Sequence, residues 1–207
     1  SDDWWDRNFL NSRSKFFSSS NDYAYSFSNC NHFYENKKEY KIFYRKKLPS
    51  GLILNNLLKY YFVKLSTIIV KKRIIKNYKF DPSYNIIGDY DLIVRISHKF
   101  KAMAFQDNLA TIRVHRENFS HNNRKMFYKE YKRWVENQDY NVSFFKKNKQ
   151  NIILQLKYLK IIYMLLEKKK FKLILEIIKY PVFLLKMKLL IIYLLPNFLI
   201  RIKIKYF

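Results

Sequence analysis

The chain has 207 residues, of which 49% are apolar, so it can bury a sizeable core and is not a globally disordered polypeptide. Its 41 Lys and Arg residues against 16 Asp and Glu give a net charge of +25, which favours a polyanionic partner, either nucleic acid or an anionic membrane face. The single cysteine, Cys30, excludes an internal disulfide and a Cys-rich zinc site, and it fits a reducing, cytoplasmic setting.

The first 120 residues have the pattern of a mixed α/β region. Apolar residues at helical spacing, with polar breakers between them, predict helices at residues 6–17, 52–62 and 87–100. Alternating apolar and polar residues, or β-branched runs, predict strands at residues 23–33, 39–44, 66–72, 103–107 and 109–115. We therefore expect one α/β domain over residues 1–120.

From about Ser120 the pattern becomes helical and basic. Residues 121–138 form a charged amphipathic stretch, and the last 57 residues contain 12 Lys and Arg but only two acids. The longest uncharged run in this tail, Leu189–Ile200, has 12 residues, whereas a membrane span needs about 20. Residues 121–207 are therefore expected to form a helical extension that lies on an anionic membrane surface. The alternative is that this tail packs on the preceding domain as ordinary core.

One acidic stretch, GDYDLIVRIS, places Asp89 and Asp91 at the approach to a helix, with Arg95 about one turn further on. Asp89 can be the N-cap of this helix, with Asp91 in a first turn that favours negative charge. It can equally be a general base, delivered at a loop-to-helix junction that faces a cleft. The local sequence leaves both interpretations open.

The order of four segments resembles glycosyltransferase family 2, the inverting sugar transferases of the GT-A type. The opening SDDWWDRNFL resembles the end of the motif L-D-S-D-D-x-W-x-P-x-x-L, and LSTIIVKKRIIKNYKFDPSYN resembles a strand, helix and FD turn of that family. GDYDLIVRIS resembles the acidic motif (E/G)DYDLWLRL, and LATIRVHRENFSHN resembles the segment Y-R-x-H-x-x-N-x-S. The resemblance covers residues 1–120 and implies the C-terminal part of a GT-A, Rossmann-like α/β domain.

The chain also departs from the family pattern. Arg7 replaces a common Pro, Asn77 and Tyr78 stand where glycines are usual, and Gly88 replaces a Glu. By the same resemblance, the first Asp of the DxD motif and the nucleotide-binding half of the domain precede Ser1. We therefore expect that this polypeptide does not transfer sugar on its own.

The resemblance implies a role for each matched side chain. Asp2 is the expected ligand of a divalent ion, Mg²⁺ or Mn²⁺, and Asp89 the expected base that deprotonates the acceptor hydroxyl. The residues that it implies at the donor diphosphate are Asp3, Arg113 and His115. Those that it implies at the acceptor, or in ordering a loop, are Trp5, Asp91 and Arg95.

Each of these assignments has a structural alternative. Asp2 and Asp3 can cap a helix that starts at Trp4, and Trp4 and Trp5 can be packing residues. His115 can be a structural histidine. Arg113 can be a solvated surface side chain.

The function that the resemblance implies is transfer of a sugar, with inversion, from a nucleotide-sugar donor to a glycan or lipid-linked acceptor. Such an enzyme is expected in bacterial surface polysaccharide synthesis, peripheral at the cytoplasmic face of the membrane, with no nucleic-acid partner. A non-enzymatic basic protein that binds nucleic acid is the first alternative, supported by the charge and by 19% aromatic residues. A membrane-surface adaptor with an inactive transferase domain is the second.

Overall fold

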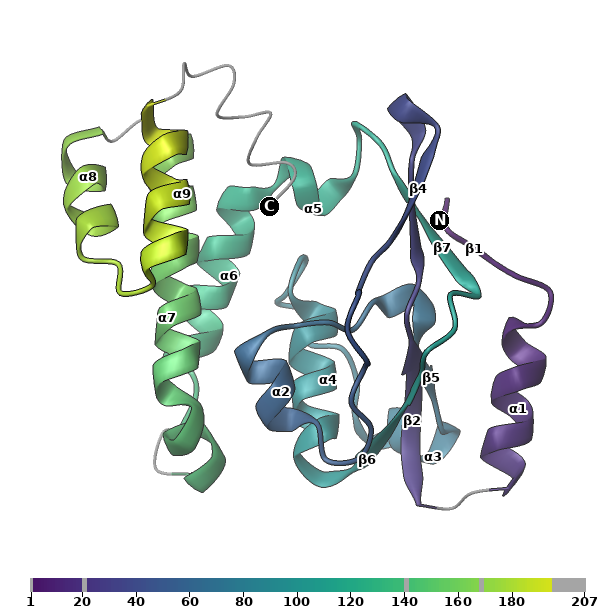
Figure 1. Ribbon diagram of the computed structural model, residues 1–207. Coiled ribbons are helices and arrows are strands. Elements are labelled where there is room, and N and C mark those ends of the chain that lie inside the picture. Colours follow the sequence, from purple (N-terminus) through teal and green to yellow (C-terminus); the bar gives the residue numbers. More distant parts are fainter. Residues whose placement is uncertain (1, 20–21, 140–141, 168–169, 195–207) are drawn as a thin grey trace. The chain divides into compact units, whose positions relative to one another are not determined.

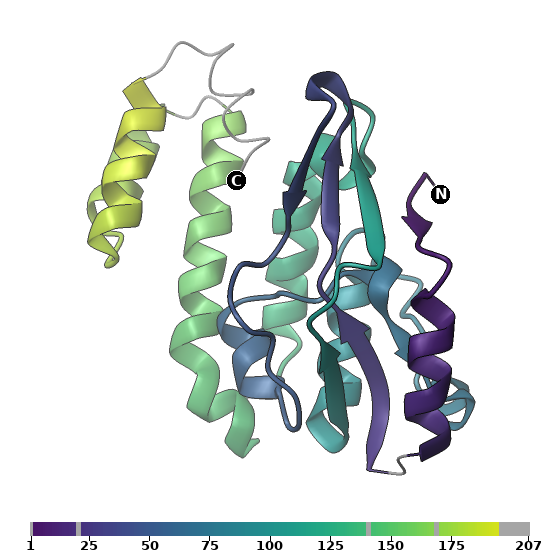
Figure 2. The same cartoon turned by 45° about the vertical axis from the view of Figure 1, so that its right-hand side comes forward.

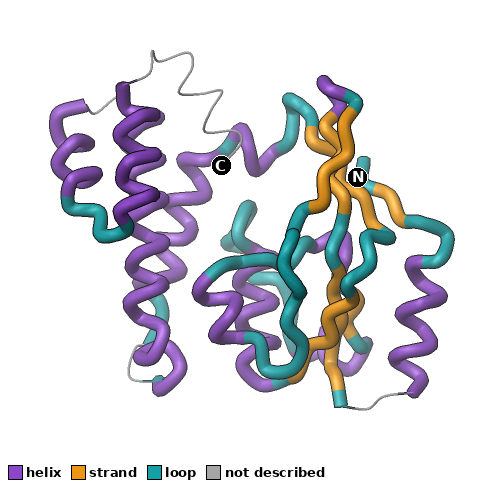
Figure 3. The backbone as a smooth tube through the Cα atoms, viewed as in Figure 1, coloured by secondary structure: helices purple, strands orange, loops and turns teal. Residues whose placement is uncertain are grey.

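The computed structural model describes residues 2–19, 22–139, 142–167 and 170–194. The chain divides into two compact units, Ser1–Asn118 and Phe119–Phe207, whereas the sequence pattern predicts a change of organisation at Ser120. The first unit contains strands and helices, and the described elements of the second are helices, so the chain is of the mixed α/β class (Figures 1 and 3). Among the described residues, no helix is both long and apolar enough to cross a bilayer.

The first unit is built on two small mixed sheets (Figures 1 and 2). The three-stranded sheet has the order β5–β2–β6, with β5 at Ile69–Val70, β2 at Tyr23–Ser28 and β6 at Lys101–Phe105. The four-stranded sheet has the order β1–β7–β3–β4, with β1 at Trp4–Trp5, β7 at Ala110–Val114, β3 at Asn31–Tyr34 and β4 at Glu39–Ile42. The pairs β2–β6 and β3–β7 are parallel, and the other pairs are antiparallel.

The strand predicted at residues 23–33 is two strands in different sheets, which corrects that prediction. The break falls at Asn29 and Cys30, both buried. The Asn29 side-chain amide donates to the Tyr44 carbonyl at 2.7 Å, and its Oδ1 accepts from the backbone N–H groups of Cys30 and Tyr44. Because a side chain satisfies these backbone groups, the ladder can be interrupted there without leaving them unpaired.

Helices pack on the three-stranded sheet to form the core of the first unit. The α-helices are α1 (Phe9–Ser19), α2 (Leu54–Lys59), α3 (Lys72–Asn77) and α4 (Gly88–Lys99), and the 3₁₀ turns are η1 (Glu35–Lys37) and η2 (Leu65–Thr67). Ile93 and Ile96 of α4 are buried in one cluster with Tyr25 and Phe27 of β2. The buried strand predicted at residues 66–72 is instead part of η2, the two-residue half-buried β5 and the first residue of α3.

The second unit has its own apolar cluster. Its helices are α5 (Phe119–Asn122), α6 (Arg124–Glu136), α7 (Ser143–Leu166), α8 (Lys170–Ile178) and α9 (Phe183–Leu194). Ile161 and Leu165 of α7, Ile177 of α8, and Leu189 and Ile192 of α9 are buried together. These residues therefore stabilise a helical unit with a core of its own.

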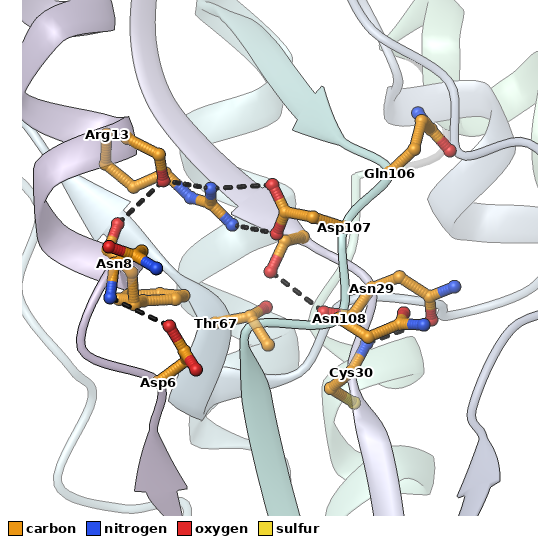
Figure 4. A network of polar contacts seen from close by, with 12 residues as sticks. Asp6, Asn8, Arg13, Asn29, Cys30, Thr67, Gln106, Asp107 and Asn108 are labelled. Atoms are coloured by element: carbon orange, nitrogen blue, oxygen red, sulfur yellow. Dashed lines mark hydrogen bonds and ion pairs between the residues drawn. The ribbon is translucent and has the colours of Figure 1, made fainter.

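A buried ion pair connects α1 to the turn after β6 (Figure 4). The guanidinium of Arg13, which is fully buried, donates to both carboxylate oxygens of Asp107 at 2.8 and 2.6 Å. It also lies over the rings of Phe9 and Phe105, at 4.7 and 4.1 Å from their centroids. The bidentate geometry and the two aromatic contacts compensate the cost of burying this charge.

Removing the charge of Asp107 is expected to destabilise the first unit. In Asp107→Asn the Arg13 charge stays buried without its counter-ion, so the free energy of unfolding should fall by about 3 kcal/mol. The matched control is Glu39→Gln, which removes one partner of the exposed Glu39–Lys41 pair and should change it by less than about 0.5 kcal/mol. Urea denaturation followed by circular dichroism measures both, and equal effects would contradict the role given to Arg13.

Candidate active site

The opening carboxylates lie beside the arginine and histidine of the distant RVH segment. Strand β1 pairs antiparallel with β7, with Trp4 opposite Thr111 and Trp5 opposite Ala110. This register brings the residues before β1 alongside the end of β7. Two motifs from opposite ends of the first unit therefore form one cluster, which consists of Asp2, Asp3, Arg113 and His115.

Asp3 is held on both of its carboxylate oxygens. The backbone N–H of Arg113 donates to Oδ1 at 3.2 Å, and the hydroxyl of Ser66 donates to Oδ2 at 2.5 Å. The Trp5 indole N–H donates to the Ser66 carbonyl at 2.6 Å, and its ring stacks on Phe9 at 4.5 Å. Asp3 and Trp5 thus fasten β1 to η2. The helix-capping alternative for Asp2 and Asp3 is wrong, because Trp4–Trp5 is a strand and α1 begins only at Phe9.

His115 donates a hydrogen bond to the Asp2 carboxylate. Its Nδ1 accepts the backbone N–H of Glu117 at 3.2 Å, so in the neutral ring the proton is on Nε2, which lies 2.6 Å from Asp2 Oδ2. Asn118 fixes this turn, because its Oδ1 accepts from the His115 backbone N–H at 2.6 Å and its amide donates to the Arg113 carbonyl. The imidazole therefore orients the Asp2 carboxylate.

The pKa of the Asp2 carboxyl is lowered. The main cause is a hydrogen bond from its own backbone amide, and the hydrogen bond and charge of His115 and the charge of Arg113 act in the same direction. The Arg113 guanidinium is about two-fifths exposed and lies 3.6 Å from Glu35 at Nη1. The cluster thus presents an ionised carboxylate at the surface next to a cation.

Asp89 is a largely buried carboxylate in the first turn of α4. The helix begins at Gly88 with Ile87 as its N-cap, and no side chain caps it, so the interpretation of Asp89 as the N-cap is wrong. Its Oδ1 accepts the Tyr90 backbone N–H at 2.8 Å, and its Oδ2 lies 3.3 Å from the Tyr61 hydroxyl, which donates to it. Burial raises the pKa of Asp89, against the opposing effects of these hydrogen bonds and of Lys64.

Tyr61 stays protonated beside this carboxylate. Burial and the negative charge of Asp89 raise the pKa of the Tyr61 phenol well above its usual value. The phenol is consequently a donor to Asp89 across the pH range in which the carboxyl titrates. It orients Oδ2 without neutralising the carboxylate.

Asp91 and Arg95 order the loop before α4. The Arg95 Nε donates to Asp91 Oδ2 at 2.8 Å, and its Nη2 donates to the Lys79 carbonyl at 2.7 Å. Asp91 is buried, and the first contact orients Arg95 within α4, whereas the second connects the helix to the turn that follows α3. The loop that precedes Asp89 is therefore held at the Lys79 carbonyl.

The segment from Tyr61 to Ser66 connects the two groups of carboxylates. Tyr61 donates to Asp89, Ser66 donates to Asp3, and the Lys64 charge lowers the pKa of Asp89. These three residues were missed in the sequence, where no acidic or histidine motif marks them. Their roles come from hydrogen bonds that span 28 residues for Tyr61 and 63 for Ser66.

The described residues do not form a complete site for Mg²⁺ or Mn²⁺. Nowhere among them do three or more His, Cys, Asp or Glu side chains form a group that can hold a metal ion. The Nε2 of His115 carries a proton and so offers no lone pair toward Asp2, and each oxygen of Asp3 already accepts one hydrogen bond that holds it in place. Asp2, which is exposed, is the more accessible of the two carboxylates in this cluster.

The chain matches no protein-family model and has no significant match among curated proteins. The chemistry of the site therefore rests on its geometry and on the four sequence motifs.

Replacing Asp89 by Asn is expected to stabilise the first unit at neutral pH. A raised folded-state pKa means that the folded protein favours the protonated carboxyl, so the contribution of this group to stability is present at low pH and lost as the pH rises through that pKa. Asn resembles the protonated form. The melting temperatures of wild type and Asp89→Asn should therefore coincide below about pH 4, and the variant's should become the higher as the pH rises.

Thermal melting at a series of pH values tests this expectation. The matched control is Asp22→Asn, which removes an exposed carboxylate ahead of β2 and should change the melting temperature little at neutral pH. If Asp89→Asn were less stable than wild type at every pH, the surroundings of Asp89 would stabilise its ionised carboxylate, and the expectation would be wrong.

Proposed function

We propose that this chain is the C-terminal part of the catalytic domain of an inverting glycosyltransferase of GT-A type, family 2. It would transfer a sugar from a nucleotide-sugar donor to a glycan or lipid-linked acceptor at the cytoplasmic face of a bacterial membrane. The observation that carries this proposal is the meeting of Asp2 and Asp3 with Arg113 and His115. Asp3 also binds Ser66, in the same short segment as Tyr61, which binds Asp89. The resemblance joins these same residues into one site, although they are far apart in the sequence.

Asp89 is the proposed general base. It would take the proton of the acceptor hydroxyl while the acceptor oxygen attacks the anomeric carbon. The bond from that carbon to the nucleoside diphosphate breaks on the opposite face, and the diphosphate leaves with the electron pair. A base acts best when its pKa is close to the working pH, and burial shifts the pKa of Asp89 in that direction.

Arg113, His115 and Asp2 are proposed to face the donor diphosphate. The departing group is an anion, and the guanidinium of Arg113 can offset part of its charge. Asp2 is the proposed ligand for Mg²⁺ or Mn²⁺, an ion that would neutralise the diphosphate when bound. His115 is proposed to hold the Asp2 carboxylate in position through its Nε2 proton.

Loss of the Asp89 carboxylate should abolish transfer. In the natural full-length polypeptide that contains this chain, Asp89→Asn is expected to lower kcat by a factor of about 10²–10⁴, because general base catalysis contributes about that much. The KM for the donor should change little, since Asp89 acts on the acceptor. Release of nucleoside diphosphate from a panel of nucleotide sugars, with and without Mg²⁺ or Mn²⁺, is the measurement.

The control variant is again Asp22→Asn, which removes an exposed carboxylate outside the site and should keep full activity. An unchanged kcat in Asp89→Asn would contradict the proposal that Asp89 is the general base. A correctly folded wild-type protein that releases no diphosphate with any donor and acceptor would contradict the transferase itself.

A further inference from the structure

Helix α9 is apolar on two opposite faces. One face, which includes Leu189 and Ile192, is buried in the cluster of the second unit. On the other face the exposed fractions are 81% for Leu184, 43% for Met187, 54% for Ile191 and 79% for Leu194. Their spacing of three, four and three residues places these four side chains on one side of the helix.

The connection from α8 to α9 continues this exposed apolar character. Ile178, at the end of α8, and Val182 and Phe183, at the start of α9, are exposed, Phe183 by 69%. We define the α9 surface as these three residues together with Leu184, Met187, Ile191 and Leu194. Single exposed apolar side chains also occur elsewhere in the chain, such as Leu10 and Leu52, but several on one side of a helix mark a candidate interaction site.

The charges on α9 and in the sequence that follows it are all positive, and the nearest acidic residue in the sequence, Glu176 of α8, pairs with Lys160. The sequence from Ile177 to Phe207 contains no acidic residue and six basic ones, which are Lys179, Lys186, Lys188, Arg201, Lys203 and Lys205. Lys179 and Lys188 are exposed, and Lys186 is half-buried. A partner for this surface must therefore combine an apolar layer with negative charge.

We propose that the α9 surface binds an anionic lipid bilayer, with α9 lying in the plane of the interface. The apolar side chains would enter the boundary of the acyl chains, and Lys179, Lys186 and Lys188 would contact the head groups. The part of α9 that the structure describes has 12 residues, whereas a span of the bilayer needs about 20.

The same charges disfavour the other occupants of an apolar face. Two copies of the α9 surface would bring lysines together without acidic partners, which is unfavourable. Nucleic acid offers negative charge but no apolar layer for Leu184 and Leu194. Membrane binding is independent of the reaction proposed above, and it would bring the protein to the surface that carries a lipid-linked acceptor.

Vesicle flotation of the natural full-length polypeptide tests the proposal. Binding is expected to vesicles of phosphatidylcholine with about 30% phosphatidylglycerol, and to be at least about tenfold weaker for pure phosphatidylcholine. The double variant Leu184→Ser/Leu194→Ser should weaken binding by about tenfold or more, since it removes the two most exposed apolar side chains of the surface. The matched control, Leu10→Ser/Leu52→Ser, removes leucines that are 55% and 68% exposed in the first unit and should bind like wild type.

A second pair of variants separates a local site from the overall charge. Lys186→Glu/Lys188→Glu and Lys46→Glu/Lys47→Glu change the net charge equally, and only the former should lose about tenfold or more in affinity. Circular dichroism spectra like that of wild type show that each variant is folded.

Three results would overturn the proposal: equal binding to neutral and anionic vesicles, equal losses in test and control variants, or a dimer that dissociates in Leu184→Ser/Leu194→Ser. Loss of vesicle binding with nucleoside diphosphate release intact would leave the transferase proposal standing.

Discussion

The first unit depends on two parallel strand pairs that follow one another along the chain. Strand β2 pairs with β6, and strand β3 pairs with β7. The segment that contains β2 and β3 therefore pairs twice with the segment that contains β6 and β7. Parallel pairing requires a long crossover, and α2, α3 and α4 lie within the crossover here. Because β7 then pairs with β1 on its other side, the start of the chain is placed against residues more than 100 positions away. The cluster around Asp2 and His115 is a consequence of this topology.

The carboxylates of the site have different surroundings, and these determine what each can do. Asp2 is exposed, with a lowered pKa, whereas Asp89 is largely buried, with a raised pKa. Both oxygens of Asp3 accept hydrogen bonds, and Asp91 pairs with Arg95, so these two hold backbone segments in place. An exposed ionised carboxylate suits contact with cations, and a buried one with a raised pKa suits proton transfer.

Periodicity predicted the regular elements better than it predicted their ends or their partners. The helices expected at residues 6–17, 52–62 and 87–100 correspond to α1, α2 and α4, because an apolar stripe facing one core specifies a helix locally. The strand expected at residues 23–33 is divided at Asn29, whose side chain bonds to Tyr44, a contact that no local pattern encodes. Tyr61 and Ser66 were missed for the same reason, since each acts through a partner brought close by the fold. The motifs single out Asp2, Asp3 and Asp89 as candidates, and the topology determines that Asp2 and Asp3 lie beside Arg113 and His115.

The two ionic sites of the first unit differ in how burial is compensated. Arg13 is fully buried, but Asp107 binds it in bidentate geometry and two aromatic rings cover it, so much of the cost of burying its charge is compensated. Asp89 is largely buried. The Tyr61 phenol and the Tyr90 backbone amide donate hydrogen bonds to its carboxylate, and Lys64 adds positive charge, but these interactions do not fully offset the cost of its desolvation. A structure selected for stability alone would replace such a carboxylate, because an uncompensated buried charge costs free energy. Its place in the first turn of α4, where the Tyr61 hydroxyl donates to it, is the physical reason that Asp89 is proposed as the general base.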